Sequence, residues 1–150
     1  SLCEVFDSVE HLNPEYVTHK GDIVIRLTIP YTAVLITDEL EGFVIPSSFV
    51  VVRTDRSVLI PEYLVWLLNS QKVKKRIYES TVSNMLGAVK PRYFAEFELD
   101  ELHISQQLMM ADLNRLAQRE AQLLAQLAAE KEKYYDYVLN RVFTDLKRGN

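Results

Sequence analysis

Cysteine, glycine and long apolar runs are scarce in this 150-residue sequence, and each scarcity excludes a class of protein. A single cysteine, Cys3, excludes an intramolecular disulfide framework and a cysteine-rich zinc site. No run of about 18 uncharged apolar residues is present, so no membrane-spanning helix is predicted. The acidic amino-terminal segment does not resemble a secretory signal. We therefore expect a cytoplasmic protein.

The residues that usually carry catalysis are also few and scattered. Only four glycines occur, and they are far apart, which excludes the usual phosphate-binding and dinucleotide loops. The three histidines lack metal-ligand spacing. The one acidic-x-Lys triplet, Asp145 to Lys147, has no neighbouring carboxylates that would help it hold Mg²⁺. We expect no catalytic residues, no metal and no cofactor.

The net charge of −4 is unevenly distributed along the chain. Residues 1–42 contain two basic and eight acidic residues, whereas residues 53–92 contain eight basic and three acidic residues. A regional positive charge of this kind is typical of a surface that binds phosphate. The alternative, in which these cations form only the solvated face of a helix, remains open.

The spacing of apolar residues differs between the two parts of the chain, strand-like segments with one helix in the first part and purely helical in the second. Together the two patterns predict an α+β fold. Residues 23–29, 33–37 and 48–53 are rich in β-branched residues and predict short strands. Helical spacing predicts a helix over 62–79, and a last strand is expected near 97–104. From Ser105 to Arg148 there is neither glycine nor proline, which predicts one long helix. We expect a small mixed α/β domain over 1–104 and the long helix over 105–148, with Ser105 as its cap.

The apolar residues of the long helix recur every eleven residues rather than every seven. A heptad register would bring charged residues such as Glu120 and Glu130 into the apolar seam. An eleven-residue period predicts a nearly straight or slightly right-handed rod, roughly 60 Å long. Such a stripe requires a covering helix, from a second copy or another subunit, unless it packs back on the strand domain. The expected interface residues are Leu113, Leu116, Leu124, Leu127, Tyr135 and Val138.

Several segments, in order, resemble the target-recognition domains of type I restriction-modification specificity subunits. They are Gly21-Asp-Ile-Val-Ile-Arg26, the segment Ile45-Pro-Ser-Ser-Phe-Val-Val-Val-Arg53, and Ile60-Pro-Glu-Tyr-Leu-Val-Trp-Leu-Leu-Asn-Ser70. Residues 87–93 match the family's glycine-containing loop, and residues 101–107 match the strand and glutamine that open its conserved helix. The family's Leu-Pro-x-Pro before that helix is absent here. The resemblance covers roughly residues 20–130.

The resemblance implies a non-catalytic, sequence-specific DNA-recognition subunit. Its partners would be double-stranded DNA, a methyltransferase subunit and, in some systems, an ATP-dependent nuclease subunit. Family members usually carry two recognition domains and two conserved helices, and this chain has one of each. It therefore resembles a half subunit that forms a homodimer through the long helix. The competing interpretation is a helical assembly module that does not bind DNA.

DNA readout needs cations for phosphate and side-chain donors that reach base edges. We expect Arg92 and Asn84 to contact bases, Lys90 to contact phosphate, and Tyr93 to stack or to pack beneath the loop. The remaining candidates lie in the same loop, on the basic helix and beside the first strand pair; they are Ser83, Lys72, Lys75, Arg76, Arg26 and Tyr31.

Overall fold

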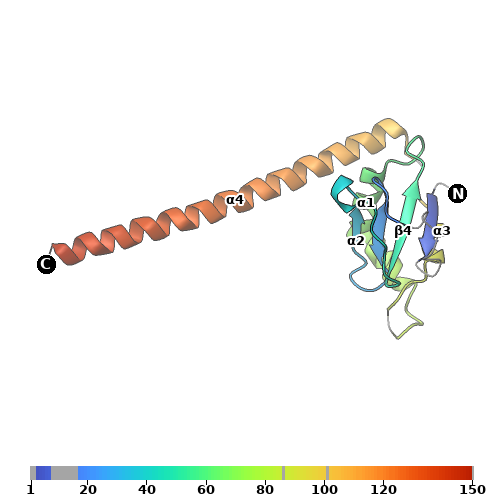
Figure 1. The fold of residues 1–150 in the computed structure, drawn as a ribbon, viewed down its shortest axis with the longest axis horizontal. Helices are drawn as coiled ribbons and strands as arrows, with labels where there is room; N and C mark the ends of the chain where they lie inside the picture. The colour runs from blue at the N-terminus through green and yellow to red at the C-terminus, as the bar shows by residue number, and fades with distance from the viewer. Residues whose placement is uncertain (1–2, 8–16, 86, 101, 150) are drawn as a thin grey trace. The chain divides into compact units, whose positions relative to one another are not determined.

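The computed structural model describes residues 3–7, 17–85, 87–100 and 102–149 and confirms an α+β fold (Figure 1). Its strands are β1 (Cys3–Asp7), β2 (Ile23–Arg26), β3 (Ala33–Leu35) and β4 (Phe49–Thr54). A 3₁₀ turn, η3, spans Asp38–Leu40. The α-helices are α1 (Pro61–Asn69), α2 (Gln71–Glu79), α3 (Arg92–Ala95) and α4 (Ile104–Arg148). Among the described residues, no helix has the length and apolar character needed to cross a membrane.

Backbone contacts divide the chain into two units, residues 1–111 and 112–150. The first unit holds the sheet, the short helices and the first two turns of α4. The second consists of the rest of α4. The long helix predicted for 105–148 is present and begins one residue earlier, at Ile104.

The sheet has the strand order β1-β4-β2-β3, and every neighbouring pair is antiparallel. β2 and β3 form a hairpin in which Val24 faces Val34. β4 pairs with β2 along one edge and with β1 along its other edge. Because side chains alternate along a strand, the two faces carry different residues. Ile23, Ile25, Val50 and Val52 lie in the main core, whereas Val24 and Val51 lie in a smaller cluster on the opposite face.

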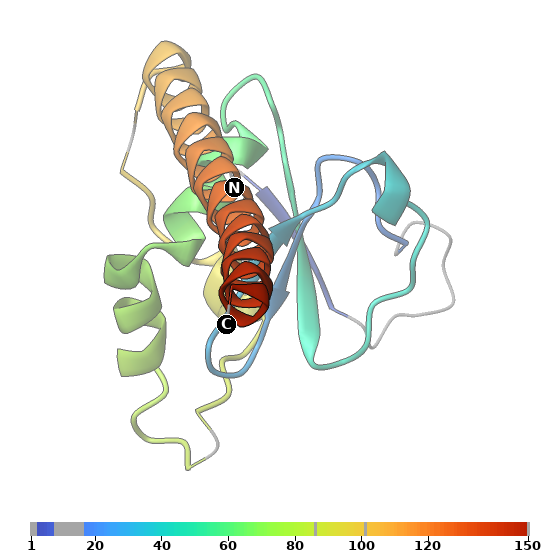
Figure 2. The same ribbon diagram turned by 90° about the vertical axis from the view of Figure 1, so that its left-hand side faces the viewer.

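Helices α1 and α2 cover the main face of the sheet (Figure 2). Leu64 and Leu68 of α1, together with Val73 and Ile77 of α2, are buried in the same cluster as the strands. Fully burying an aliphatic side chain contributes about 1.5–3 kcal/mol, so this layer is the main source of stability for the first unit.

The prediction of a single helix over 62–79 is wrong, because the helix is interrupted at Ser70. Ser70 has extended backbone angles, and its hydroxyl accepts from the Val73 N–H as the N-cap of α2. The preceding side chain, Asn69, accepts from the Ala33 N–H and donates to the Ala33 carbonyl, at 3.0 and 2.8 Å. Asn69 thus fixes the end of α1 against β3, and α2 starts in a new direction.

Two further expectations for the segment before α4 are wrong. Residues 97–100 form no strand, and Ser105 lies inside α4 rather than capping it. The His103 carbonyl accepts from the N–H groups of Gln106 and Gln107, and the Gln106 side chain accepts from the His103 N–H at 3.0 Å. The Gln106 side chain thus supplies one half of a capping box at His103, two residues earlier than the predicted cap Ser105.

Candidate nucleic-acid interface

A hollow of about 310 Å³ lies between the end of α2 and α3. Five of the residues predicted to bind DNA line it: Ser83, Asn84, Lys90, Arg92 and Tyr93. Thr81 and Glu96 also line it, and neither was predicted. Glu96 is the C-cap of α3, four residues after Arg92. No helix was predicted for this segment, so the spacing of the two residues was not a signal in the sequence.

Local hydrogen bonds shape the loop that carries these residues. The Thr81 hydroxyl donates to the Tyr78 carbonyl at 2.7 Å and extends the last turn of α2. The Asn84 N–H then donates to the Thr81 carbonyl, and the Asn84 side chain donates to the Ala88 carbonyl at 3.0 Å. Asn84 therefore closes the loop on itself and can contact a base only with part of its amide.

The loop is also fixed to the strand domain by the β2–β3 connection. The Tyr31 hydroxyl donates to the Gly87 carbonyl at 2.6 Å, and the Val89 N–H donates to the Leu27 carbonyl at 2.8 Å. Tyr31 is only 3% exposed, which places it in the core. We therefore remove Tyr31 from the residues expected to touch DNA and give it the role of holding Gly87.

The two central cations of the hollow differ in their surroundings. Lys90 is exposed and has no ion pair within the described part of the chain. Arg92 is 83% exposed, and its Nε donates to Oε1 of Glu96 at 2.6 Å. An exposed pair of this kind contributes only about 0.3–0.5 kcal/mol, so a phosphate or a guanine edge can compete for the guanidinium.

Tyr93 packs beneath the hollow rather than standing free. Its ring makes edge-to-face contacts with Phe94 and Phe97, at centroid distances of 5.5 and 5.7 Å. Burial raises the pKa of the Tyr93 hydroxyl above its ordinary value, and it outweighs the lowering effects of Arg76 and of a hydrogen bond with Ser80. The phenol is therefore neutral at physiological pH, and Tyr93 acts as support for the loop.

The remaining predicted cations do not line the hollow. The guanidinium carbon of Arg76 lies 4.5 Å from the centre of the Phe97 ring. Arg76 therefore packs on the aromatic cluster of Tyr93, Phe94 and Phe97. Lys72 and Lys75 are exposed on α2, and Lys75 is 3.8 Å from Glu79. Arg26 ends β2, where its Nε donates to the Thr28 hydroxyl at 3.1 Å.

Two apolar side chains on the same loop were not predicted as contacts. Val82 is 75% exposed and Met85 is fully exposed. Apolar side chains in a basic loop suit the methyl group of thymine. Nothing in the sequence pattern separates such residues from ordinary loop residues.

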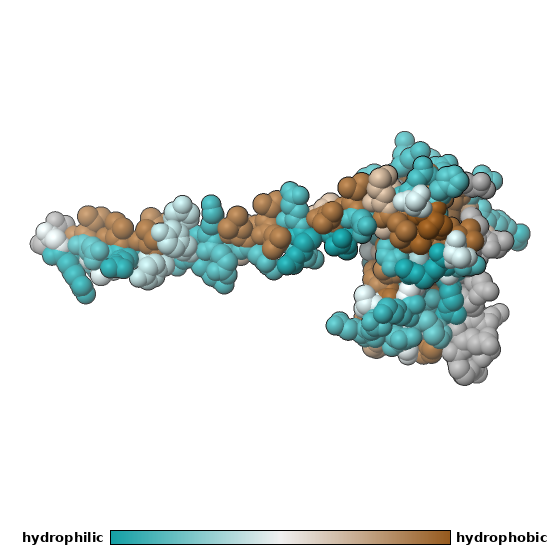
Figure 3. Space-filling view, turned by 90° about the horizontal axis from the view of Figure 1, so that it is seen from above, coloured by the Kyte–Doolittle hydropathy of each residue, from teal (hydrophilic) through white to brown (hydrophobic). Residues whose placement is uncertain are grey.

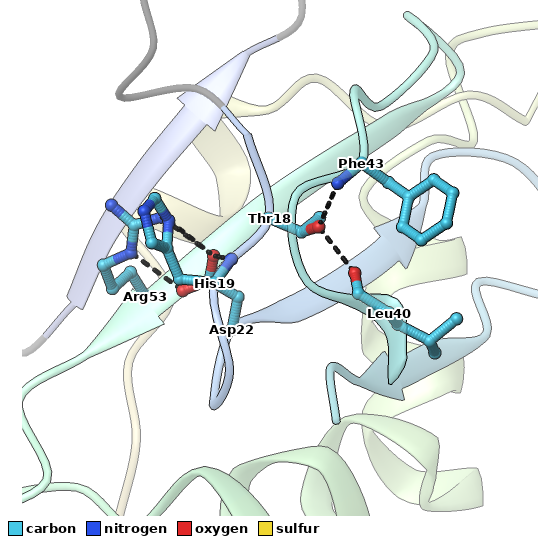
Figure 4. A network of polar contacts seen from close by, with 6 residues as sticks. All are labelled: Thr18, His19, Asp22, Leu40, Phe43 and Arg53. Atoms are coloured by element: carbon cyan, nitrogen blue, oxygen red, sulfur yellow. Dashed lines mark hydrogen bonds and ion pairs between the residues drawn. The ribbon is translucent and has the colours of Figure 1, made fainter. Parts of the chain in front are cut away.

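A second polar cluster lies around the turn before β2 (Figure 4). Arg53 makes two 2.8 Å hydrogen bonds to the buried Asp22 carboxylate, and the His19 N–H donates to the same carboxylate. The His19 Nδ1 lies 2.7 Å from Nη2 of Arg53, so this ring nitrogen accepts. Gly21, with φ +88°, provides the left-handed turn that brings these groups together. The cluster fixes the turn against β4 and has a structural role.

The predicted interface residues of α4 carry their apolar side chains on the surface of the single chain. Leu113, Leu116, Leu124 and Leu127 are 53–58% exposed, and Tyr135 is exposed to the same degree. Val138 is half-buried. Within the described residues, no group of histidine, cysteine and carboxylate side chains is arranged to hold a metal ion.

Comparison with known proteins shows a similarity of fold. No protein-family model matches the sequence, and no curated protein matches it. The structure resembles a chain from a solved structure that concerns complex assembly and conformational transition of the type I R-M system. The TM-score is 0.63 at 24% identity, over 78% of this chain and 31% of the other. This chain therefore spans about a third of the length of that protein, and the two have a related fold.

Proposed function

We propose that this chain is a DNA-recognition subunit of a type I R-M system, corresponding to one half of a specificity subunit. In this role it supplies sequence recognition and leaves catalysis to partners. The observation that carries the proposal is the hollow between α2 and α3. Ser83, Asn84, Lys90 and Arg92 line it, and Tyr93, which also lines it, packs against Phe94 and Phe97. The related fold of a chain in a type I R-M structure supports the same assignment.

The chemistry of the hollow fits duplex DNA. Lys90 is an exposed point charge suited to phosphate, and Arg92 offers a planar donor pair suited to guanine. Glu96 can accept a hydrogen bond from cytosine once Arg92 has moved to a base. Positioning and readout groups therefore lie within one loop and one short helix, as base-specific recognition requires.

The proposed partners follow from the resemblance to type I specificity subunits. A methyltransferase subunit, with or without an ATP-dependent nuclease subunit, would supply the reaction, and the exposed stripe of α4 would serve a helix of another chain. The proposed arrangement is a cytoplasmic complex in which the recognition domain spans residues 1–104 and the helix spans 105–148.

Sequence selection in the presence of the partner tests this proposal. The chain is mixed with the methyltransferase subunit of the same system and with a random duplex pool, and bound duplexes are sequenced. We expect one short sequence to be enriched. Lack of enrichment, together with salt-independent binding, would favour the alternative of an assembly module that does not bind DNA.

A further inference from the structure

Two segments that are far apart in the sequence bring exposed apolar side chains to one place. Val82 and Met85 belong to the loop after α2, and both are exposed. Ile29 belongs to the β2–β3 connection, and it is 56% exposed. The position that a Cβ atom would take at Gly87 lies 3.3 Å from Cδ1 of Ile29, so Ile29 lies against the same loop. We call Ile29, Val82 and Met85 the apolar tip.

Hydrogen bonds hold the loop residues of the tip in two successive turns. The Gly87 N–H donates to the Asn84 carbonyl at 3.1 Å, so Met85 lies in the same turn as Gly87. The Asn84 N–H donates to the Thr81 carbonyl at 2.7 Å and closes a turn that contains Val82. The bonds to the β2–β3 connection described above fix both turns to the strand domain. The tip is therefore ordered before a ligand binds, so binding costs less conformational entropy.

The apolar tip lies between cations along both of its segments. Residues 27–32 and 80–89 contain no charged side chain. Arg26 precedes the first of these segments, Lys90 and Arg92 follow the second, and all three cations are exposed. Glu79 and Glu96, the nearest carboxylates along the second segment, are each paired with a cation four residues before them. An apolar surface flanked by cations matches a groove of duplex DNA, where base edges lie between two rows of phosphates.

This charge pattern distinguishes the tip from the apolar stripe of α4. Figure 3 shows hydrophobic residues recurring along one side of that helix. α4 carries seven basic and six acidic residues, so its stripe is accompanied by charges of both signs, which suits a helix of another protein. The tip is flanked mainly by cations, and a polyanion is the ligand that this charge favours.

Thymine carries the apolar group that such a tip can recognise. Base edges in the major groove present hydrogen-bond donors and acceptors, and the C5 methyl group of thymine is the apolar group among them. We propose that the apolar tip contacts this methyl group, so that the sequence selected by the chain contains a thymine read by Ile29, Val82 and Met85. The inference rests on the proposed DNA-recognition function and adds to it the class of base that this part of the surface selects.

Removing single methyl groups from the DNA tests the inference without altering the protein. The probe is the duplex enriched with the proposed methyltransferase partner, in which each thymine in turn is replaced by uracil. At one position this change should weaken binding by about fourfold, as expected for the loss of one buried methyl group. If a sequence is enriched but every uracil duplex binds as tightly as the parent, this inference is overturned and the proposed function stands. If no sequence is enriched, both are overturned.

Variants of the tip connect the methyl group to these side chains. Ile29→Ala and Met85→Ala should each weaken binding of the parent duplex by about three- to tenfold and should reduce the effect of uracil. Val58→Ala, at an exposed valine outside the loop, is the control and should retain the full effect. Weaker binding of all duplexes with an unchanged uracil effect would overturn the proposal, because a side chain that inserts between base pairs at any sequence gives that result. Weaker binding of the methyltransferase subunit in the absence of DNA would also overturn it and would assign the tip to a protein contact.

Discussion

Oε1 of Gln107 accepts a hydrogen bond from the Ile60 N–H at 2.8 Å, across 47 positions of the sequence. The Nε2 of the same side chain donates to the Val58 and Leu102 carbonyls, both at 3.0 Å. One buried amide thus satisfies three backbone groups and joins the first turns of α4 to the segment that enters α1. Gln107 is the polar anchor of the long helix in the first unit.

Replacing Gln107 with alanine should therefore destabilise the first unit. Leaving a buried backbone group without a partner costs about 1–3 kcal/mol, and three such groups are affected. We expect the free energy of unfolding, measured with urea, to fall by at least about 2 kcal/mol. Gln118→Ala, at an exposed position of the same helix, is the matched control and should be neutral. Equal behaviour of the two variants would remove the anchoring role.

Tyr31→Phe tests the support of the loop that we propose binds DNA. The change removes only the hydroxyl that donates to the Gly87 carbonyl, and the ring can stay in the core. We expect a loss of about 1 kcal/mol in unfolding free energy and faster amide exchange in residues 82–90. Tyr78→Phe, at an exposed tyrosine, should change neither quantity. Unchanged exchange in Tyr31→Phe would show that the loop is held by other contacts.

Self-association through α4 predicts a change in mass on mutation. Replacing Leu116 and Leu127 with glutamate places charges in the stripe and should convert dimers to monomers in sedimentation. Gln118→Glu/Gln122→Glu adds the same charge on the opposite side of the helix and should leave the mass unchanged. A mass unaffected by the leucine changes would mean that the stripe serves a different contact.

The path of the helix is a separate prediction. An eleven-residue apolar period should leave α4 nearly straight over residues 113–139 in the assembled complex, because it lacks the mismatch that drives left-handed coiling. A crystal structure of the assembly measures this. Regular left-handed packing in which Glu120 and Glu130 occupy seam positions of a heptad would contradict the prediction.

The strands and the long helix were predictable because their signals are local. The β-branched runs around Ile23, Ala33 and Val50 form β2, β3 and β4, and the uninterrupted helix formers after Ile104 form α4. The break at Ser70 was missed because Asn69 bonds to Ala33, which is distant in sequence. β1 was missed for the same reason, since its pairing with β4 spans about 50 residues.

The candidate site was predictable as a region but not in its details. The excess of cations over 53–92 indicated the loop that contains Lys90 and Arg92. The burial of Tyr31 and the packing of Tyr93 depend on contacts with Gly87 and Phe97, which only the folded chain brings together. The same residue types support a loop and contact DNA, so sequence alone does not distinguish the two roles.

The salt dependence of DNA binding tests the central claim most directly. With the proposed methyltransferase partner present, duplex affinity is measured by anisotropy over a range of salt for wild type, Lys90→Ala, Arg92→Ala and the control Lys20→Ala. Lys20 is an exposed lysine outside the hollow, paired with Asp38. Lys90→Ala should weaken all sequences alike and reduce the salt slope by about one. Arg92→Ala should reduce discrimination at one base pair by about 1–3 kcal/mol, and Lys20→Ala should match wild type. Identical, salt-insensitive binding by all four proteins would contradict DNA recognition through this hollow.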